Sequence, residues 1–291
     1  MRIRLNASLF VAIERYSRAL SSHLMPTMFK TTKALHPLLE HILQLKRPSL
    51  RGSTTDAVQQ LLLQYLGFAD RDANGNFIYR QGEGSKTLFM CHYDTVETRT
   101  GKNRLSYDRQ NMIVRVAGGG ILGADCGAGM YLLIRMLQAG VPGTYVFFND
   151  EEAGRIGSTE YRILEGAPTG CVRAIAFDRK GYTDVVTHQL MQAGCSLNFA
   201  DALSTALNVH IPGVTQYAPT DKGSFTDSYS FFDCIHECTN ISVGYFNEHQ
   251  QSEYLDYGFL QRLLAGLLQL DFEALPTTRL LPRRLARFTL D

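Results

Sequence analysis

The chain has 291 residues, of which 45% are hydrophobic and 20% charged, a composition typical of a globular protein with a sizeable core. Its 29 Lys and Arg residues balance 28 Asp and Glu residues, so no net field would draw it to nucleic acid or to an anionic membrane. No apolar run approaches the roughly eighteen residues of a membrane-spanning helix. The six cysteines are scattered and contain no C-x-x-C pair, which favours a reducing, cytoplasmic setting.

The first 28 residues are rich in Arg and Ser and contain one acid, Glu14. This composition is found in organellar transit peptides and also in loosely attached arms. We predict an N-terminal extension over residues 1–28 and a single domain over residues 29–291.

Helical spacing of apolar residues begins the domain, over residues 33–45 and 56–66, with Ser53, Thr54 and Thr55 as capping residues before the second helix. Later helices are predicted over 130–137, 196–207 and 257–270. Short apolar strands are predicted over 77–79, 87–91, 112–116, 144–148, 174–177 and 240–246. Because strands and helices alternate, we expect an α/β fold, a three-layer sandwich whose central sheet is mixed but mostly parallel, with helices on both faces.

Side chains that can bind a metal follow several of these strands. They are His92 with Asp94, the pair Glu151 and Glu152, Asp178, His249 and, at a helix start, Asp125. Any one of them alone would be an ordinary polar residue at the end of an element. Five such positions in one chain indicate a shared site, since an open α/β sheet gathers functional groups at its strand ends.

Histidine and carboxylate ligands together suit Zn²⁺. A set with more acids than histidines has enough ligands for two ions, about 3.5–4 Å apart, bridged by one carboxylate and one water. Manganese or cobalt could replace zinc. Asp94, two residues after His92, is placed to accept the second N–H of that imidazole.

Two adjacent acids, Glu151 and Glu152, follow an apolar strand. Like charges in a buried position repel, so such a pair is costly unless both groups are used. The pair suggests a division of labour, in which one carboxylate binds metal and the other exchanges a proton with the metal-bound water and the leaving nitrogen.

The ordered motifs His92-Tyr93-Asp94, Gly123-Ala124-Asp125, residues 151–158 (EEAGRIGS), Phe177-Asp178 and Glu248-His249 resemble those of the co-catalytic dizinc exopeptidases. This superfamily includes bacterial leucyl aminopeptidase and glutamate carboxypeptidase. The resemblance runs from about residue 87 to residue 256. It implies that residues 29–291 form one peptidase-like catalytic domain.

The resemblance also assigns roles within the motifs. It implies that His92 and Asp178 bind one zinc ion, that Glu152 and His249 bind the other, and that Asp125 bridges the two. Glu151 would be the general base.

The chain departs from the superfamily at Cys126, where a second Asp commonly follows the bridging one. Because the bridging residue is kept, we expect activity to survive, with Cys126 as a buried thiol or a further weak ligand.

Spacing between the motifs restricts the subfamily. Asp178 and His249 are 71 residues apart, which leaves no room for the lid domain of carboxypeptidase and aminoacylase relatives. His92 and Asp125 are 33 residues apart, which disfavours relatives with a domain inserted there. The chain is therefore most similar to compact, single-domain aminopeptidases.

Such aminopeptidases bind a free α-amine with carboxylates and cleave the adjacent amide bond of a peptide or small amide substrate. Tyr245 and Ser228 are candidates for donors to the scissile carbonyl. Phe231 and Phe232 are candidates for a wall of the substrate pocket.

Three other functions stay open. A carboxypeptidase, N-acyl deacylase or amidase is possible, because Arg155, Arg179 or Lys180 could bind a substrate carboxylate. A non-catalytic binding module on the same fold is disfavoured by the presence of Glu151 and all the ligands. A phosphoesterase-like dimetal site is disfavoured by the paired glutamates; His188 could line the cleft in any of these cases.

Overall fold

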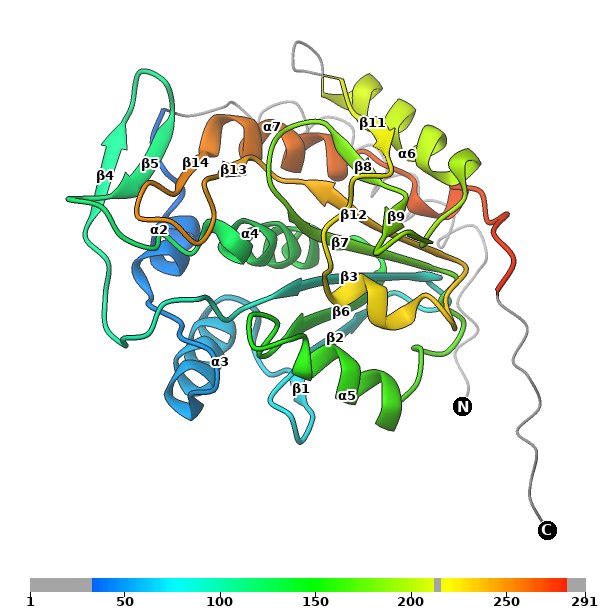
Figure 1. Cartoon of the computed structure of the whole chain (residues 1–291), viewed down its shortest axis with the longest axis horizontal. Coiled ribbons are helices and arrows are strands. Elements are labelled where there is room, and N and C mark those ends of the chain that lie inside the picture. The colour runs from blue at the N-terminus through cyan, green and yellow to red at the C-terminus, as the bar shows by residue number, and fades with distance from the viewer. Residues whose placement is uncertain (1–32, 212–215, 282–291) are drawn as a thin grey trace, which may run out of the picture. The chain divides into compact units, whose positions relative to one another are not determined.

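The structure is a computed structural model that describes residues 33–211 and 216–281. The extension predicted over residues 1–28 lies outside these ranges. An eight-stranded sheet runs through the described residues (Figure 1). Its strands, in spatial order, are β1 (Asp70–Arg71), β2 (Phe77–Gln81), β6 (Gly143–Phe148), β3 (Thr87–His92), β7 (Arg173–Arg179), β12 (Glu237–Ser242), β8 (Asp184–Val186) and β11 (Ala218–Thr220).

The centre of this sheet is parallel. Strands β6, β3, β7 and β12 all run in the same direction. Antiparallel pairs flank them, since β2 opposes β6 and β8 opposes β12. The predicted mixed, mostly parallel sheet is therefore confirmed, and the carboxyl ends of the central strands meet at one edge.

Helices cover both faces of the sheet, as predicted. One face packs with α2 (Pro37–Gln44), α3 (Gly52–Leu66), α4 (Ala124–Gln138), α6 (Leu197–His210) and α7 (Tyr257–Leu267), and the other with α5 (Ile156–Leu164) and η2 (Asp227–Phe231). Side chains of β3 alternate between these two cores, with Phe89 on the α4 side and Met90 on the α5 side. Both cores are dry, so β3 is a fully buried strand with an unbroken apolar run.

A second, four-stranded antiparallel sheet contains β13 (Tyr245–Phe246), β14 (Tyr254–Asp256), β5 (Ile113–Val116) and β4 (Leu105–Asp108). The pairing of β5 with β4 confirms the predicted hairpin. A short pair, β9 (His188–Gln189) with β10 (Gln192–Ala193), and the one-turn η3 (Phe272–Ala274) complete the elements.

The strand predicted over 240–246 is two strands in the structure. It breaks at Gly244, which has φ of 94° and whose added Cβ would lie 2.6 Å from the ring of Phe259. Only glycine tolerates this backbone beside an aromatic ring. The break sends β13 into the second sheet and the chain that follows it, with His249, back over the strand ends.

Helix boundaries differ modestly from the predicted ones. Helix α3 begins at Gly52, so Thr54 and Thr55 lie inside its first turn and do not cap it. Helix α7 begins after Asp256, whose carboxylate accepts the N–H of Phe259 at 2.7 Å. Within the described ranges, no helix combines the length and apolarity needed to cross a bilayer. All six cysteines are free thiols.

Candidate metal centre

The predicted metal ligands come from separate segments that the fold brings together. His92 is the last residue of β3, and Asp178 lies next to the end of β7. Glu152 follows β6, Asp125 lies in the first turn of α4, and His249 follows β13. Because β3, β6 and β7 are parallel neighbours, their ends bring these side chains to a single edge of the sheet.

Asp125 lies between the two histidines. Its Oδ1 is 3.1 Å from Nε2 of His92, and its Oδ2 is 3.2 Å from Nε2 of His249. The same nitrogen of His92 is 3.3 Å from Asp178 Oδ1, and that of His249 is 2.9 Å from Glu152 Oε1. The side chains thus form two three-residue groups that share one carboxylate, a donor set that fits two bridged zinc ions.

These groups line a cavity of about 160 Å³, which we call the metal pocket. Its walls are His92, Asp125, Glu151, Glu152, Asp178, Arg179, Lys180, Ser224, Phe225, Tyr245, Glu248 and His249. All the predicted ligands and the predicted general base therefore face one cavity.

Electrostatics in the metal pocket favour a bound cation. Hydrogen bonds to Asp125 and Glu152 raise the pKa of His249 to about 10. Burial raises the pKa of Asp178 to about 6; the charge of His92 opposes this rise and the charge of Asp125 adds to it. The histidines thus hold protons among carboxylates, and metal ions that bind the same atoms would displace those protons.

Glu151 is the acid that the resemblance assigns as general base. Burial raises its pKa to about 10, His92 opposes the rise, and the carboxylates of Asp227, Asp178 and Glu152 add to it. A dication in the metal pocket would lower this pKa. Glu151 is therefore a carboxyl whose proton affinity depends strongly on the charge held beside it, which suits a group that takes up and releases a proton.

Asp94 is buried and lies behind the metal pocket. Its carboxylate accepts the backbone N–H of Glu151 at 3.0 Å and of Glu152 at 3.1 Å, and the hydroxyl of Ser49 at 2.8 Å. His92 Nδ1 lies 3.1 Å from the carbonyl oxygen of Asp94 and 3.5 Å from its carboxylate. The expected partner of the imidazole is thus the right residue, but the main-chain oxygen is the nearer acceptor, and the carboxylate chiefly holds the Glu151–Glu152 turn.

The charge of Asp94 fits this role. Burial opposes its ionisation, but hydrogen bonds from His92, Ser49 and the Glu151 N–H outweigh burial and hold the pKa of Asp94 below its usual value. Asp94 therefore remains an acceptor.

Glu253 is a functional residue that sequence reasoning missed. Its Oε2 accepts the N–H groups of Leu122 and Gly123, and its Oε1 accepts those of Ala124 and Asp125, at 2.7–3.2 Å. One buried carboxylate thus fixes the backbone that carries the bridging ligand. No motif marks Glu253, because its partners are main-chain groups about 130 residues earlier.

Arg47 fixes the same region from the opposite direction, and it too was missed. Its guanidinium is fully buried and donates to the carbonyl oxygens of Tyr93 and Gly123, each at 2.6 Å. It also donates to Ile42 at the end of α2. These bonds join α2, the end of β3 and the start of α4, and so tie two ligand-bearing segments together.

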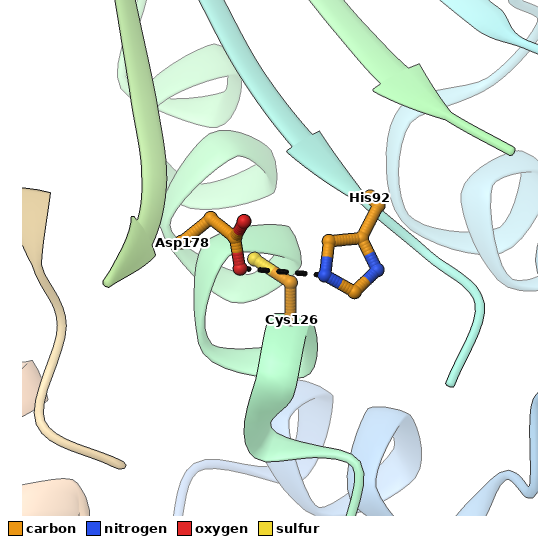
Figure 2. A group of neighbouring side chains, drawn as sticks. All are labelled: His92, Cys126 and Asp178. Atoms are coloured by element: carbon orange, nitrogen blue, oxygen red, sulfur yellow. Dashed lines mark ion pairs between the residues drawn. The ribbon is translucent and has the colours of Figure 1, made fainter. Parts of the chain in front are cut away.

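Cys126 lies directly below the first ligand group, and Figure 2 shows its sulfur beside His92 and Asp178. The thiol is buried and donates to the carbonyl oxygen of Phe177 at 2.9 Å. Burial raises its pKa well above the usual value. These contacts fit the expected buried thiol, since a protonated sulfur that donates to a carbonyl is a poor metal ligand.

The candidate donors to the substrate carbonyl differ in position. Tyr245 lines the metal pocket and its hydroxyl donates to Asp178 at 3.2 Å. Ser228 is fully buried and accepts a hydrogen bond from Gln189, so it does not face the metal pocket. Asp178 is held in addition by Asn240, which accepts its backbone N–H at 2.9 Å.

The cations proposed for a substrate carboxylate are not equivalent. Arg179 pairs with Asp184 at 2.9 Å, and Lys180 pairs with Glu248 at 2.6 Å. Both are therefore already neutralised at the rim of the metal pocket. Arg155 stacks on aromatic rings outside it.

Two other expected positions lie away from the metals. His188 contacts Thr187 and is not among the residues that line the metal pocket. Phe231 and Phe232 belong to the smaller core under α5, with Phe232 also at the edge of a second cavity.

No protein-family model and no curated protein matches this chain by sequence. Solved structures do match it. The aminopeptidase PepT from Bacillus cereus has a TM-score of 0.60 at 13% identity, over 79% of this chain and 95% of that one. The TET1 peptidase of Pyrococcus horikoshii has a TM-score of 0.60 at 15% identity, over 79% and 98% of the two chains.

An aminopeptidase from the archaeon Desulfurococcus kamchatkensis is similar to the same extent, with a TM-score of 0.58 at 16% identity, over 80% of this chain and 92% of that one. Almost the whole of each of these peptidases is therefore matched by the larger part of this chain. The described residues have the zinc-exopeptidase fold that these aminopeptidases share.

Proposed function

We propose that this chain is a dizinc exopeptidase of the aminopeptidase type, which cleaves an amide bond next to the free amino end of a peptide or small amide. One observation carries the proposal: the two oxygens of Asp125 each face a different histidine, and each histidine has a second carboxylate beside it. The fold, shared with known aminopeptidases, supports it.

The residues of the metal pocket have distinct tasks in this proposal. His92 and Asp178 would hold one zinc ion, Glu152 and His249 the other, and Asp125 both. Bound zinc would polarise the scissile carbonyl and lower the pKa of a water molecule between the ions.

The proton passes through Glu151. Its carboxylate takes a proton from the water and later gives it to the leaving nitrogen. Asp94 positions Glu151 by accepting its backbone N–H. The Tyr245 hydroxyl, at the wall of the metal pocket, is the candidate donor to the carbonyl oxygen.

Charge at the metal pocket supports recognition of an amine. Glu151, Glu152, Asp178 and Glu248 line it, whereas its two cations are already paired with acids. A substrate ammonium group would find acceptors there. A carboxylate at the same position would face like charges, which argues against a carboxypeptidase that binds its substrate end in the metal pocket.

The test is hydrolysis of matched amino-acyl and N-blocked amides by the purified protein, before and after treatment with a chelator and with zinc restored. We expect zinc-dependent cleavage of free-amine substrates and two zinc ions per chain by elemental analysis. Glu151→Gln should lower kcat by about 10²–10⁴-fold, because the proton acceptor is lost.

Glu160→Gln, on the exposed face of α5, is the matched control and should keep wild-type kcat. Cleavage restricted to N-blocked substrates would replace the aminopeptidase by a deacylase. A protein that binds no metal and cleaves nothing would leave a binding module on the peptidase fold.

A further inference from the structure

A second and larger cavity, of about 760 Å³, lies beside α5 and η2. We call it the arginine cavity, because Arg155, Arg162 and Arg279 line it with only one acid, Asp233. Aromatic and aliphatic side chains form the rest of its wall, including Tyr229. Its walls therefore suit a ligand that is partly apolar and carries a negative charge.

Two of the three arginines are already engaged. Arg162 makes two hydrogen bonds to the carboxylate of Asp233, at 2.6 and 3.2 Å. Arg279 donates to the carbonyl oxygens of Phe232 and Ile235 at 2.8 and 2.7 Å, and so holds the loop after η2. Neither has its full set of donors available to a ligand.

Arg155 is the exception. Its only hydrogen bond among residues 33–211 and 216–281 is to the hydroxyl of Ser230 at 2.7 Å, and within those ranges it forms no ion pair with an acid. Asp227 and Glu151 attract it through space without a hydrogen bond. A half-buried guanidinium with one neutral partner is a site for an anion.

Arg155 is also fixed in place. The centre of its guanidinium lies 3.4 Å from the ring centroid of Phe225 and 5.2 Å from that of Tyr229. Stacking on aromatic faces holds the guanidinium plane and leaves its edge free for the two oxygens of a carboxylate. Little conformational entropy would be lost on binding.

The position of Arg155 relates the two cavities. Phe225, on which it stacks, is itself a wall of the metal pocket. Arg155 follows Glu151 by four residues and precedes α5 with φ of 60° and ψ of 39°, a left-handed conformation that favours glycine. An arginine at a strained backbone position beside the general base indicates that its side chain has a use there.

We propose that Arg155 and the arginine cavity bind a carboxylate on the leaving-group side of the substrate, so that the enzyme acts on short peptides held at both ends. The amino end would lie at the metal pocket, and the chain would pass Phe225 to reach Arg155. The carboxylate comes either from the free C-terminus of a short peptide or from an acidic side chain. This inference rests on the proposed function.

The test compares kcat/KM for three peptides: alanyl-alanyl-alanine, its C-terminal amide, and the amide of alanyl-aspartyl-alanine. We expect wild-type protein to prefer a carboxylate-bearing peptide over the neutral amide by about ten- to a hundredfold, mainly through KM. Arg155→Gln should bring that ratio close to one. Arg155→Lys, which keeps the charge without the planar fork, should give an intermediate ratio.

The matched control is Arg80→Gln, which removes an exposed arginine from an ion pair with Asp70 and should keep the wild-type ratio. Preference for the free acid alone assigns the C-terminus, and preference for the aspartyl amide alone assigns a side chain. Melting curves of the two Arg155 variants show that they fold.

Equal use of all three peptides by wild type, or a preference that survives in Arg155→Gln, would overturn the inference while the proposed function stands. Absence of zinc-dependent cleavage of every peptide would overturn the proposed function and the inference with it.

Discussion

Two buried carboxylates that are not proposed ligands, Asp94 and Glu253, organise the metal centre through main-chain N–H groups. Asp94 holds the turn that carries Glu151 and Glu152, and Glu253 holds the first turn of α4, which carries Asp125. Hydrogen bonds to a charged acceptor are stronger than those between neutral groups. The position of each ligand is thus fixed one residue away from its side chain.

Replacing Glu253 tests this arrangement. Glu253→Gln exchanges one acceptor oxygen for an NH₂ group that faces two N–H donors, so two hydrogen bonds are lost and the donors stay buried. We expect the free energy of unfolding to fall by about 2–4 kcal/mol, measured by urea denaturation. Zinc affinity should fall as well, because Asp125 is no longer held.

Glu83→Gln, on an exposed turn, makes the same chemical change without buried partners and should leave the free energy of unfolding within about 0.5 kcal/mol of wild type. If the two variants were equally stable, the four bonds to Glu253 would carry no weight.

At this scale, the sequence reveals the residues whose role lies in their own side-chain chemistry. His92, Asp178 and the paired glutamates stand out because each follows an apolar strand. Glu253 and Arg47 do not, because their partners are main-chain atoms of distant segments that carry no side-chain signature. Only tertiary structure brings such partners together.

Among the elements, α2 depends on an unusual cap. His36 precedes it and accepts the N–H of Leu38 at 3.2 Å, while its other ring nitrogen faces Arg135 of α4. Burial, and secondly the charge of Arg135, lower the pKa of His36 below 6.5. The helix that carries Arg47 to the metal centre therefore begins with an imidazole that must stay neutral.

The pH dependence of stability follows from that shift. Because the folded state binds a proton to His36 less tightly than the unfolded state does, the contribution is full above pH 6.5 and is lost as the pH falls below it. His36→Asn keeps a capping side chain but cannot titrate. We expect its free energy of unfolding, measured in urea at pH 7.5 and 5.5, to fall less than that of wild type.

His41, on the same helix, also has a lowered pKa and is common to both proteins, so the comparison isolates His36. An equally steep fall in His36→Asn would show that the cap does not contribute.

Element boundaries were predictable only where local chemistry decides them. The parallel strands are apolar along their whole length, and this pattern locates them. The break at Gly244 was missed, because one glycine in an apolar run indicates a break only when Phe259 occupies the space of its side chain. The stacking of Arg155 on Phe225 was missed for a similar reason, since 70 residues separate the two in sequence.

For the molecule as a whole, the metal centre concentrates charge at the edge of a sheet whose two faces are dry. Carboxylates placed so closely repel each other, and the cost is met either by protons or by metal ions. Metal ions that bind only the folded state stabilise it by about 4 kcal/mol at a free concentration of about 1,000 times Kd.

We therefore expect zinc removal by a chelator to lower the Tm by about 10 °C, with recovery when zinc is restored, measured by scanning calorimetry. Asp125→Asn, which removes the shared ligand, should make the Tm insensitive to zinc. A wild-type Tm that does not respond to the chelator would contradict a resident metal pair.

The order of these groups along the chain bears on how the protein is made. His92, Asp125, Glu152 and Asp178 belong to strands and a helix that are synthesised early, whereas His249 and the clamp from Glu253 come near the end of the 291-residue chain. A polypeptide still on the ribosome thus has one complete three-residue group and half of the other. The second ion can be captured only when β13 and the segment after it have emerged and docked, so the enzyme is assembled without activity and acquires it in its last step of folding.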